Sequence, residues 1–479
     1  MDKKMRTGNT SLLLLLLAGM FVTLLNVSII NVMLPQIMTQ FNCTATAAQW
    51  LSTGFMLLAS IVITLVPWLS KRFQYKTLFI TAMVSLVTGS LLCFISPIFP
   101  LLLIGRLIQA LGYGLLLPLS MILVLAITPP QKRGFNMGLL SIGMLLAPAL
   151  GPTLAGITIT YLSWRFLFLI MALIGAAVLL VSLATFHYRN ATQSARPDLW
   201  GILLSASGLT ALLYGINQAG TSGWNHLGVL LPLMGGILLL ALFVLVELKR
   251  PDPLLNLRVF KDYNFSSNVV VTVVLQMVLT GALMLMPLYF ENVMGYSGLK
   301  TGLLLLPASL LTGITGVIAG RLYDKIGIKP LAIAGTLIMV VAAILLARLT
   351  PATPFMQSFL AYTFFVLGTA VISTPITTAA YARVPQAQNG HAATLQNALR
   401  QVAGAIGVSV LITTMSFSSQ SLDLALSPVA GASPAVLAAS HGIASAFTLA
   451  LALCALALLL SLFLVSKRKM VGARMTVGR

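Results

Sequence analysis

Charged residues are scarce in this sequence. Asp, Glu, Lys and Arg make up 8% of its 479 residues, whereas soluble domains contain about 25%. So few charges cannot cover a water-facing surface, which argues against a soluble enzyme. The three cysteines, Cys43, Cys93 and Cys454, show neither paired nor C-x-x-C spacing, so we expect no disulfide framework and no metal site.

Acidic residues are rarer still, with 8 Asp and Glu against 28 Lys and Arg, for a net charge of +20. The basic residues lie in short clusters between apolar runs rather than on one face, so nucleic acid is not an expected partner. The sequence contains no G-x-x-x-x-G-K-[ST] phosphate loop, so no nucleotide is expected either. No acid lies near the centre of an apolar run; the eight are Asp2, Asp198, Glu247, Asp252, Asp262, Glu291, Asp324 and Asp423.

Long apolar runs are what the sequence has in abundance, and 58% of its residues are hydrophobic. Runs such as SLLLLLLAGMFVTLL approach the roughly 20 residues that cross a bilayer as a helix. The alternation of polar and apolar residues typical of outer-membrane barrel strands is absent. We therefore predict an all-α integral membrane protein with fourteen transmembrane spans between Ser11 and Val465.

The distribution of Lys and Arg predicts the orientation of these spans. If the N-terminus lies in the cytoplasm, the alternating loops place nearly all of the basic residues on the cytoplasmic side. The exceptions are Arg165, Lys300 and Arg348 in outer loops and Arg106 and Arg400 within spans. We therefore expect a multi-pass protein of the plasma (inner) membrane with both termini in the cytoplasm.

A short motif occurs twice, after the second span and after the tenth. The second copy reads GRLYDKIGIK, and its marked positions are Gly320, Asp324, Lys325 and Gly327. The first copy reads PWLSKRFQYK, with Lys71 in place of the acid, Arg72 after it, and Gln74 in place of the second glycine. The glycine permits close helix approach, and the acid can pair with a basic residue or a helix N-terminus.

If the two copies are equivalent, the chain consists of two six-span halves separated by an inserted pair of spans. The predicted boundaries are residues 1–190 for the first half, 191–262 for the inserted spans with an inner-surface linker, and 263–479 for the second half. Apolar and basic residues interleave from Leu254 to Lys261, which suggests a short element on the inner membrane surface.

Three further motifs resemble those of one transporter family. The fourth span holds Arg106 and Gln109 in a loose R-x-x-Q-G pattern, and the fifth span holds GMLLAPALGPTLAG, with Gly143, Gly151, Pro152 and Gly156. The first span reads TLLNVSIINVMLP, where Asn26 replaces an expected acid and Asn31 matches. Together these motifs resemble the fourteen-span drug/proton antiporters of the major facilitator superfamily. The resemblance implies multidrug efflux by alternating access, with the proton gradient as energy source and no cofactor.

Two motifs leave alternatives open. Arg106 either lines a cavity, where it tunes a proton site or meets an anionic group, or is a buried arginine that backbone carbonyls satisfy. The Gly151-Pro152 pair is either a hinge or tight seam that limits proton leak, or a packing kink common in membrane helices. The resemblance favours the functional alternative for the second motif.

Other polar residues are weaker candidates for the substrate and proton pathway. Glu291 is either a proton acceptor at a cavity mouth or a solvated acid at the rim. Glu247 is interpreted as a snorkelling residue of the membrane interface, and His391 and His441 as interfacial residues that are second-choice proton carriers. The remaining pathway candidates are Asn26, Asn31, Gln109, Gln276, Gln396, Asn397 and Arg400.

The expected partners are small amphipathic substrates, protons and the lipid bilayer. A multidrug exporter is the first hypothesis. The second is a dedicated exporter of one neutral or anionic amphiphile such as a fatty acid, peptide or lipid, which the buried Arg106 and Arg400 without central acids favour. A receptor or scaffold that transports nothing is the least favoured, because the halves repeat and the fifth span carries a Gly-Pro motif.

Overall fold

The computed structural model describes residues 2–43, 45–129, 132–188, 190–192, 198–250, 253–385, 388–420 and 433–465, some of them in backbone only. The described chain forms long α-helices, one short 3-10 helix and connections, without a strand. Its long helices are α1 (Asp2–Phe41), α2 (Ala45–Arg72), α3 (Tyr75–Ile95), α4 (Phe99–Ile127), α5 (Arg133–Tyr161), α6 (Arg165–Thr185), α7 (Leu199–Ser222), α8 (Leu227–Lys249), α9 (Tyr263–Asn292), α10 (Gly298–Ile326), α11 (Ile328–Leu346), α12 (Phe355–Ala380), α13 (Asn389–Gln420) and α14 (Pro434–Leu462).

These helices have the length and composition of membrane spans. Thirteen of them, all but α5, contain a described stretch that is long and apolar enough to cross a bilayer. Helix α5 has 29 residues, and 20 helical residues already extend about 30 Å. The prediction of an all-helical membrane protein is therefore confirmed.

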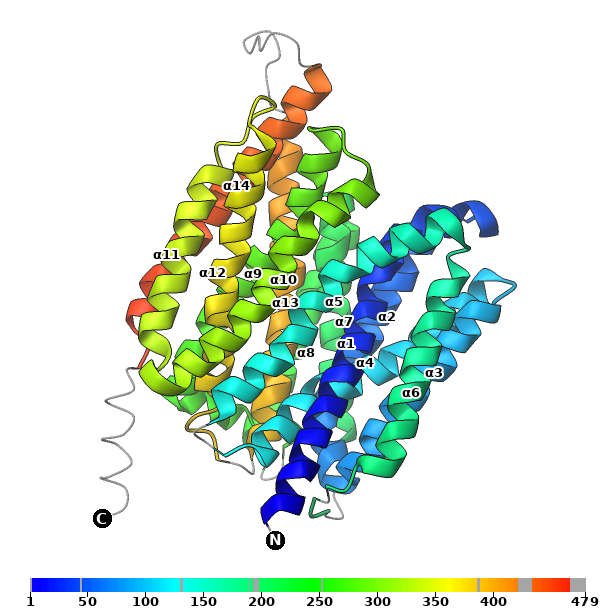
Figure 1. Cartoon of the computed structure of the whole chain (residues 1–479), viewed down its shortest axis with the longest axis vertical. Helices are drawn as coiled ribbons and strands as arrows, with labels where there is room; N and C mark the ends of the chain where they lie inside the picture. The colour runs from blue at the N-terminus through cyan, green and yellow to red at the C-terminus, as the bar shows by residue number, and fades with distance from the viewer. Residues whose placement is uncertain are drawn as a thin grey trace.

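The helices α1 to α6 and α9 to α14 form two groups that lie beside one another (Figure 1). Each group has its own apolar core. One core is drawn chiefly from α1 to α6, and the other is drawn from α9 to α14. The last turns of α2 and α10 contain basic residues, and α5 begins with Arg133, so we call the end of the bundle where they lie the basic end. The start of α1 and the end of α14 lie at this end in Figure 1.

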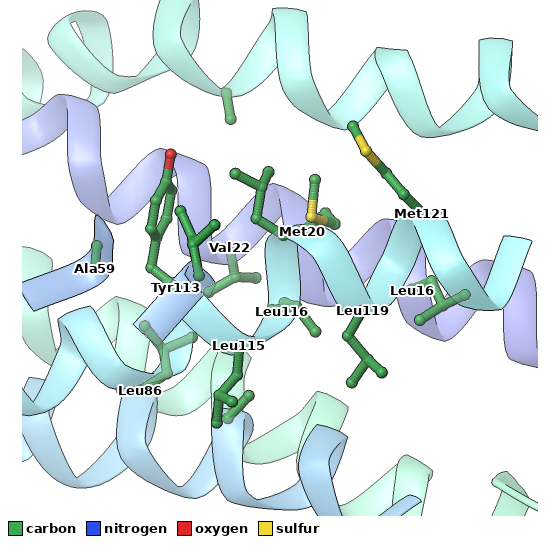
Figure 2. Packing of buried hydrophobic residues seen from close by; sticks show 14 of the residues in the cluster. Leu16, Met20, Val22, Ala59, Leu86, Tyr113, Leu115, Leu116, Leu119 and Met121 are labelled. Atoms are coloured by element: carbon green, nitrogen blue, oxygen red, sulfur yellow. The ribbon is translucent and has the colours of Figure 1, made fainter. Parts of the chain in front are cut away.

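Helix α4 is the centre of the first core. Figure 2 shows Leu115, Leu116 and Leu119 of this helix beside Met20 of α1 and Leu86 of α3. Most of the length of α4 is buried, because α1, α2 and α3 all pack against it. A helix surrounded in this way can hold a polar side chain away from both lipid and water.

The two groups of helices meet most closely at the basic end. The first apolar core includes residues of the second group there, namely Phe265, Val269, Ala380, Tyr381, Val384, Ala392 and Ala393. These come from the starts of α9 and α13 and from the end of α12 and the turn after it. The second core has no such members from α1 to α6 among the described residues. In Figure 1 the groups converge toward the basic end and splay apart at the opposite end.

Helices α7 and α8 pack against each other, and α7 lies between the two groups. Helix α7 contacts α2 on one side and α13 on the other. Asn217 Nδ2 donates to Thr53 Oγ1 of α2 at 2.9 Å, and Ser409 Oγ of α13 donates to the Ile216 carbonyl at 2.6 Å. Trp50 of α2 also stacks on Tyr214 with ring centroids 6.4 Å apart. The α7 helix therefore bridges the two groups away from the basic end.

A 3-10 helix, η2 (Leu257–Lys261), follows α8 where the sequence predicts a short element on the membrane surface. Its surroundings differ from that expectation. Leu254, Leu255 and Val259 are all nearly inaccessible, at 2 to 3% exposure. Leu254 and Leu255 pack with Phe243 of α8 and Leu395 of α13, so the apolar residues of this linker face the protein.

Candidate functional site

Helices α5 and α10 share the most extensive contact between the two groups. Paired glycines allow it, since a Cβ on Gly320 would lie 2.2 Å from the Gly134 carbonyl oxygen. One turn further along, a Cβ on Gly138 would lie 3.0 Å from the Gly316 carbonyl oxygen. No larger residue fits at the first of these contacts without moving a helix, so the first motif glycine sets the spacing of this seam.

Asp324 joins α10 to the first turn of α5. Its Oδ1 accepts from the Gly134 amide at 3.1 Å and its Oδ2 from the Phe135 amide at 3.2 Å. The carboxylate thus satisfies two of the free amides at a helix N-terminus, where the helix dipole also favours an anion. The Arg321 guanidinium lies 4.4 Å from the centre of the Phe135 ring. Both contacts cross from one group of helices to the other at the basic end.

The remaining motif residues lie at the turns that follow α2 and α10. Gly327 ends α10 with φ of 83°, a left-handed conformation that glycine adopts without strain. Lys325 is exposed, as is Arg72, whereas Lys71 is half-buried. In the first copy Gln74 binds within its own group: its Nε2 donates to the Asn190 carbonyl at 2.9 Å. The two copies therefore make different contacts, one between the groups and one inside the first.

Arg106 is fully buried at 0% exposure, about two turns into α4. Its Nη1 donates to Asn26 Oδ1 at 2.5 Å and to Gln109 Oε1 at 2.8 Å. Its Nε donates to the Leu51 carbonyl at 3.3 Å, and its guanidinium lies 4.5 Å from the centre of the Phe55 ring. The guanidinium is therefore buried and hydrogen-bonded, with its shortest bonds to side-chain amides rather than to backbone carbonyls, and its role in the pathway stays a prediction. The network joins α1, α2 and α4, and Gln109 extends it to Ser90 Oγ of α3 at 2.8 Å.

Arg400 lies in the middle third of α13 and is in a different position. It is half-buried, and its Nε donates to Gln276 Oε1 of α9 at 3.2 Å. Both side chains line a small pocket of about 10 Å³ between α9, α12 and α13, which is room for about one water molecule. The other lining residues are Thr272, Leu275, Leu279, Ser373, Ile376 and Thr377. No acid is among the described residues that line this pocket, so the Arg400 guanidinium is the charged group there.

The centre of the basic end brings Met121 of α4 against α12 and α13. Tyr381 Oη and Asn397 Nδ2 approach the Met121 sulfur at 3.9 and 3.4 Å. Gln396, a predicted pathway residue, is 1% exposed, and neither of its amide atoms has a hydrogen-bond partner. An opening of this end to water or substrate would supply partners to this amide.

The other predicted residues are dispersed. Gly151 lies against α1, where an added Cβ would collide with Ser28 Oγ, so a tight helix seam exists at this position. Gly156 is half-buried further along α5, and Glu291 is exposed at the end of α9. Asn31, Gly143 and Pro152 are described as helical backbone only, and their surroundings lie outside the described part of the chain. The structure thus brings Arg106, Asn26 and Gln109 together, and separately Arg400 and Gln276.

One sequence interpretation is wrong. Glu247 does not snorkel to the membrane interface, because its side chain is 2% exposed beneath the linker after α8. His391, expected near the interface, lies at the start of α13, where it is 6% exposed and its Nδ1 accepts from the Asn256 amide at 3.2 Å. Both side chains are covered because the linker folds back over the helix ends. By contrast His441 is exposed.

The pocket hydroxyls and the Met121 contact were missed by the sequence reasoning. A signal for the hydroxyls exists: Thr272 and Gln276 are four residues apart on α9, as are Ser373 and Thr377 on α12. Polar residues with this spacing share one face of a helix, so two polar stripes in apolar spans were visible. Nothing in the sequence marks Met121 as a residue that joins α4 to α12 and α13.

Comparison with known proteins adds the family to this geometry. Residues 16–408 match the sequence profile described as the Major Facilitator Superfamily. The chain belongs to this superfamily. It is accordingly a multi-pass membrane transporter and not an enzyme.

Several members of the superfamily are similar over most of the chain. The MFS-type transporter YhcA of Bacillus subtilis is 40% identical over 84% of this chain and 76% of its own length. The lincomycin resistance protein LmrB of Listeria monocytogenes is 31% identical over 94% of this chain and 95% of its own. The multidrug export protein EmrB of Escherichia coli is 29% identical over 82% and 77%, respectively.

Solved structures agree with the fold. The human organic anion transporter MFSD10 aligns with a TM-score of 0.64 at 16% identity, covering 95% of this chain and 99% of that one. The proton:xylose symporter XylE aligns with a TM-score of 0.62 at 17% identity, covering 96% and 97%. The predicted major facilitator fold is confirmed.

Proposed function

We propose that this transporter is a secondary active exporter of amphipathic drugs or toxic compounds, driven by proton entry through alternating access. Relatives named for lincomycin resistance and multidrug export support the export of drugs. The observation that supports this mechanism is that the two helix groups are in contact at the basic end, through a shared apolar core and the Asp324 hydrogen bonds to α5. In alternating access such groups rock about a site near the bilayer midplane.

The basic end faces the cytoplasm in this proposal, because basic loops are retained there. The arrangement is then one that is closed toward the cytoplasm. To take up a compound from inside, the protein must separate Asp324 from the start of α5 and Met121 from Tyr381 and Asn397. A carboxylate at a helix N-terminus contributes about 0.3–1 kcal/mol when exposed and up to about 2 when partly buried. Contacts of this size hold the closed form and still permit opening.

The pocket around Arg400 is the proposed substrate site. At about 10 Å³ it is closed in this arrangement and must widen during the transport cycle to admit a substrate. It combines apolar walls from Leu275, Leu279 and Ile376 with a few polar groups, which is the usual composition of small-molecule sites. Gln276 orients the guanidinium from the neighbouring helix. The pocket lies part-way along α9 and α13 and toward the end of α12, which supports a location away from the membrane surface, as in transporters that bind substrates near the midplane.

A dedicated exporter of one neutral or anionic amphiphile is the second candidate. The observation that favours it is the charge of the pocket, where Arg400 stands without an acid. A cation would be repelled by this arginine, whereas a carboxylate or phosphate would accept hydrogen bonds from its free fork. The Asn26 position, which holds a neutral residue bound to Arg106, offers no carboxylate for a cationic drug either.

Substrate-induced proton movement in proteoliposomes tests both candidates. An internal pH dye reports proton flux while matched cationic, neutral and anionic amphiphiles are added to wild type, Arg400→Ala, and the exposed control Arg348→Ala. A hydrogen bond to a charged group is worth about 1.5–3 kcal/mol, so we expect Arg400→Ala to lower flux with its preferred substrate by roughly tenfold or more. Arg348→Ala should match wild type.

The pattern of active compounds separates the candidates. Flux with several unrelated compounds, including neutral and anionic ones, supports the multidrug exporter. Flux with one neutral or anionic class supports the dedicated exporter. Equal flux with the preferred substrate in wild type and Arg400→Ala would contradict the proposed site, and transport without any proton movement would contradict the coupling.

A further inference from the structure

Two carboxyl groups are buried together at the basic end of the inserted helix pair. Asp198 directly precedes α7 and is 8% exposed, while Glu247 lies near the end of α8 and is 2% exposed. Acids are seldom buried to this extent without partners. Neither residue belongs to the α5–α10 seam or to the Arg400 pocket, so the proposed transport cycle assigns them no role.

Each carboxyl group uses one oxygen in a defined contact. Asp198 Oδ1 accepts from the Gly201 amide at 2.9 Å and also pairs with Arg250 Nη1. Glu247 Oε2 accepts from the Leu255 amide at 3.0 Å. The second oxygens, Asp198 Oδ2 and Glu247 Oε1, are buried without a hydrogen-bond partner.

The two unpartnered oxygens point to the same place. A Cβ added to Gly201 would lie 2.6 Å from Glu247 Oε1 and 2.7 Å from Asp198 Oδ2. Two ionised carboxylates so arranged repel each other, and each leaves a lone pair unsatisfied. One proton between the oxygens removes the repulsion and supplies the missing hydrogen bond to both.

The charged groups around the two carboxyl groups also indicate that one proton is bound. Arg250 is the cation in contact with it. Arg258, on the neighbouring linker, instead directs Nη2 to the Leu248 carbonyl at 3.3 Å, and Lys249 is exposed. His391 of α13 uses Nδ1 as an acceptor for the Asn256 amide. Among the described residues, two carboxylates face one arginine, which leaves a net negative charge in a buried site. A single bound proton brings that charge to zero.

We propose that Asp198 and Glu247 form a proton-binding site. The proton is bound to Glu247 Oε1, which donates a hydrogen bond to Asp198 Oδ2. Asp198 remains the carboxylate, because its other oxygen pairs with Arg250. The bound ligand is a single proton, which enters or leaves without any change in covalent bonds between heavy atoms. Gly201 is the residue that leaves room for the two carboxyl groups to meet.

The site fastens the linker that follows α8. Glu247 holds the linker through the Leu255 amide, and the next residue, Asn256, bonds to His391 at the start of α13. Helix α13 also carries Arg400. Loss of the proton leaves two repelling carboxylates beneath this linker and loosens its hold on α13. A consequence for transport rests on the proposed function, whereas proton binding itself does not.

Infrared spectroscopy of the purified full-length protein tests the proposal directly. A protonated carboxyl group gives a carbonyl band that an ionised one lacks, and this band is followed as pH is raised. We expect a band at neutral pH in wild type that Glu247→Gln removes and Gly201→Ala shifts or removes, since the added Cβ separates the oxygens. The control Asp262→Asn alters another helix-capping acid, which accepts from the Phe265 amide, and should retain the band.

Thermal unfolding in detergent provides a second readout that is independent of transport. Gln at position 247 can donate to Asp198 and accept from Leu255, as protonated Glu does. Wild type should lose stability as pH rises and the proton leaves, and Glu247→Gln should lack this loss. A wild type without the carboxyl band, a band that persists in Glu247→Gln, or identical pH profiles would each overturn the proposal. Failure of the proteoliposome assay alone would count against the transport function and leave these results unaffected.

Discussion

The two seams between the helix groups are built differently. At one seam α5 and α10 touch directly through paired glycines, and Asp324 caps α5. At the other, α7 lies against both α2 and α13 and bridges them with hydrogen bonds from Asn217 and Ser409. Each seam includes a helix that ends in a copy of the same motif, α10 at the first seam and α2 at the second. Only the copy after α10 retains its acid and both glycines.

This difference indicates how much each seam depends on its motif. The α5–α10 seam needs a particular backbone distance, which Gly134 and Gly320 set, and a charge at one helix end. The α2–α13 side makes its contacts through a third helix, so it needs neither. The first copy therefore tolerates Lys71 and Gln74, and Gln74 bonds with Asn190 inside its own group instead.

The largest effect is expected from Gly320→Ala. The added Cβ would lie 2.2 Å from the Gly134 carbonyl oxygen, so the seam must widen, at a cost of about 1–3 kcal/mol. We expect transport in proteoliposomes to fall by roughly tenfold or more, because about 1.4 kcal/mol corresponds to tenfold. Gly235→Ala is the control, since a Cβ there meets no atom within 4 Å. Equal losses in both variants would show that glycine content, not the seam, matters.

The next effect is expected from Asp324→Asn. The amide retains one acceptor but loses the charge that suits the start of α5, at a cost of about 0.5–2 kcal/mol. The closed basic end should become less populated. Labelling of a cysteine introduced at Gln396 measures this, since Gln396 is buried in the closed form. Faster labelling in Asp324→Asn than in an Asp324-containing parent is the expected result, and unchanged labelling would contradict the clamp.

A smaller effect is expected on the α7 side from Ser409→Ala. It removes one hydrogen bond, from Ser409 Oγ to the Ile216 carbonyl at 2.6 Å, worth about 0.5–1.5 kcal/mol. Stacking of Trp50 on Tyr214 and the Asn217 bond remain. The unfolding temperature should fall slightly while labelling at the basic end stays unchanged. A large rise in labelling would mean that both seams control the same closure.

The smallest effect on transport is expected from Gln74→Ala. Its two bonds with Asn190, at 2.9 and 3.2 Å, lie within the first group of helices, so their loss affects that group and not its contact with the second. Transport should remain within about twofold of wild type, since 0.4 kcal/mol corresponds to that factor. A loss as large as that of Asp324→Asn would show that the two motif copies act alike despite their different residues.

Much of the architecture followed from local properties of the chain. Apolar runs of about 20 residues predict helices in a bilayer, because each helix satisfies its own backbone there. Motif order predicted the superfamily, and the second motif copy predicted which residues would lie at a helix junction. The fates of Arg106 and Arg400 were not predictable in this way, since both read as a single arginine in an apolar span.

Tertiary packing decided the burial and the hydrogen-bond partners of those two arginines. The neighbours of Arg106 come from α1, α2 and α4, far apart in sequence, and together they satisfy its guanidinium and exclude water. Arg400 has one such neighbour, Gln276, and remains half-buried beside a pocket. The sequence by itself determined the helices, the basic loops and the scarcity of acids, because these depend on local composition. Only the folded chain placed Asp198 against Glu247, because a linker that turns back over the helix ends brings together residues 49 positions apart.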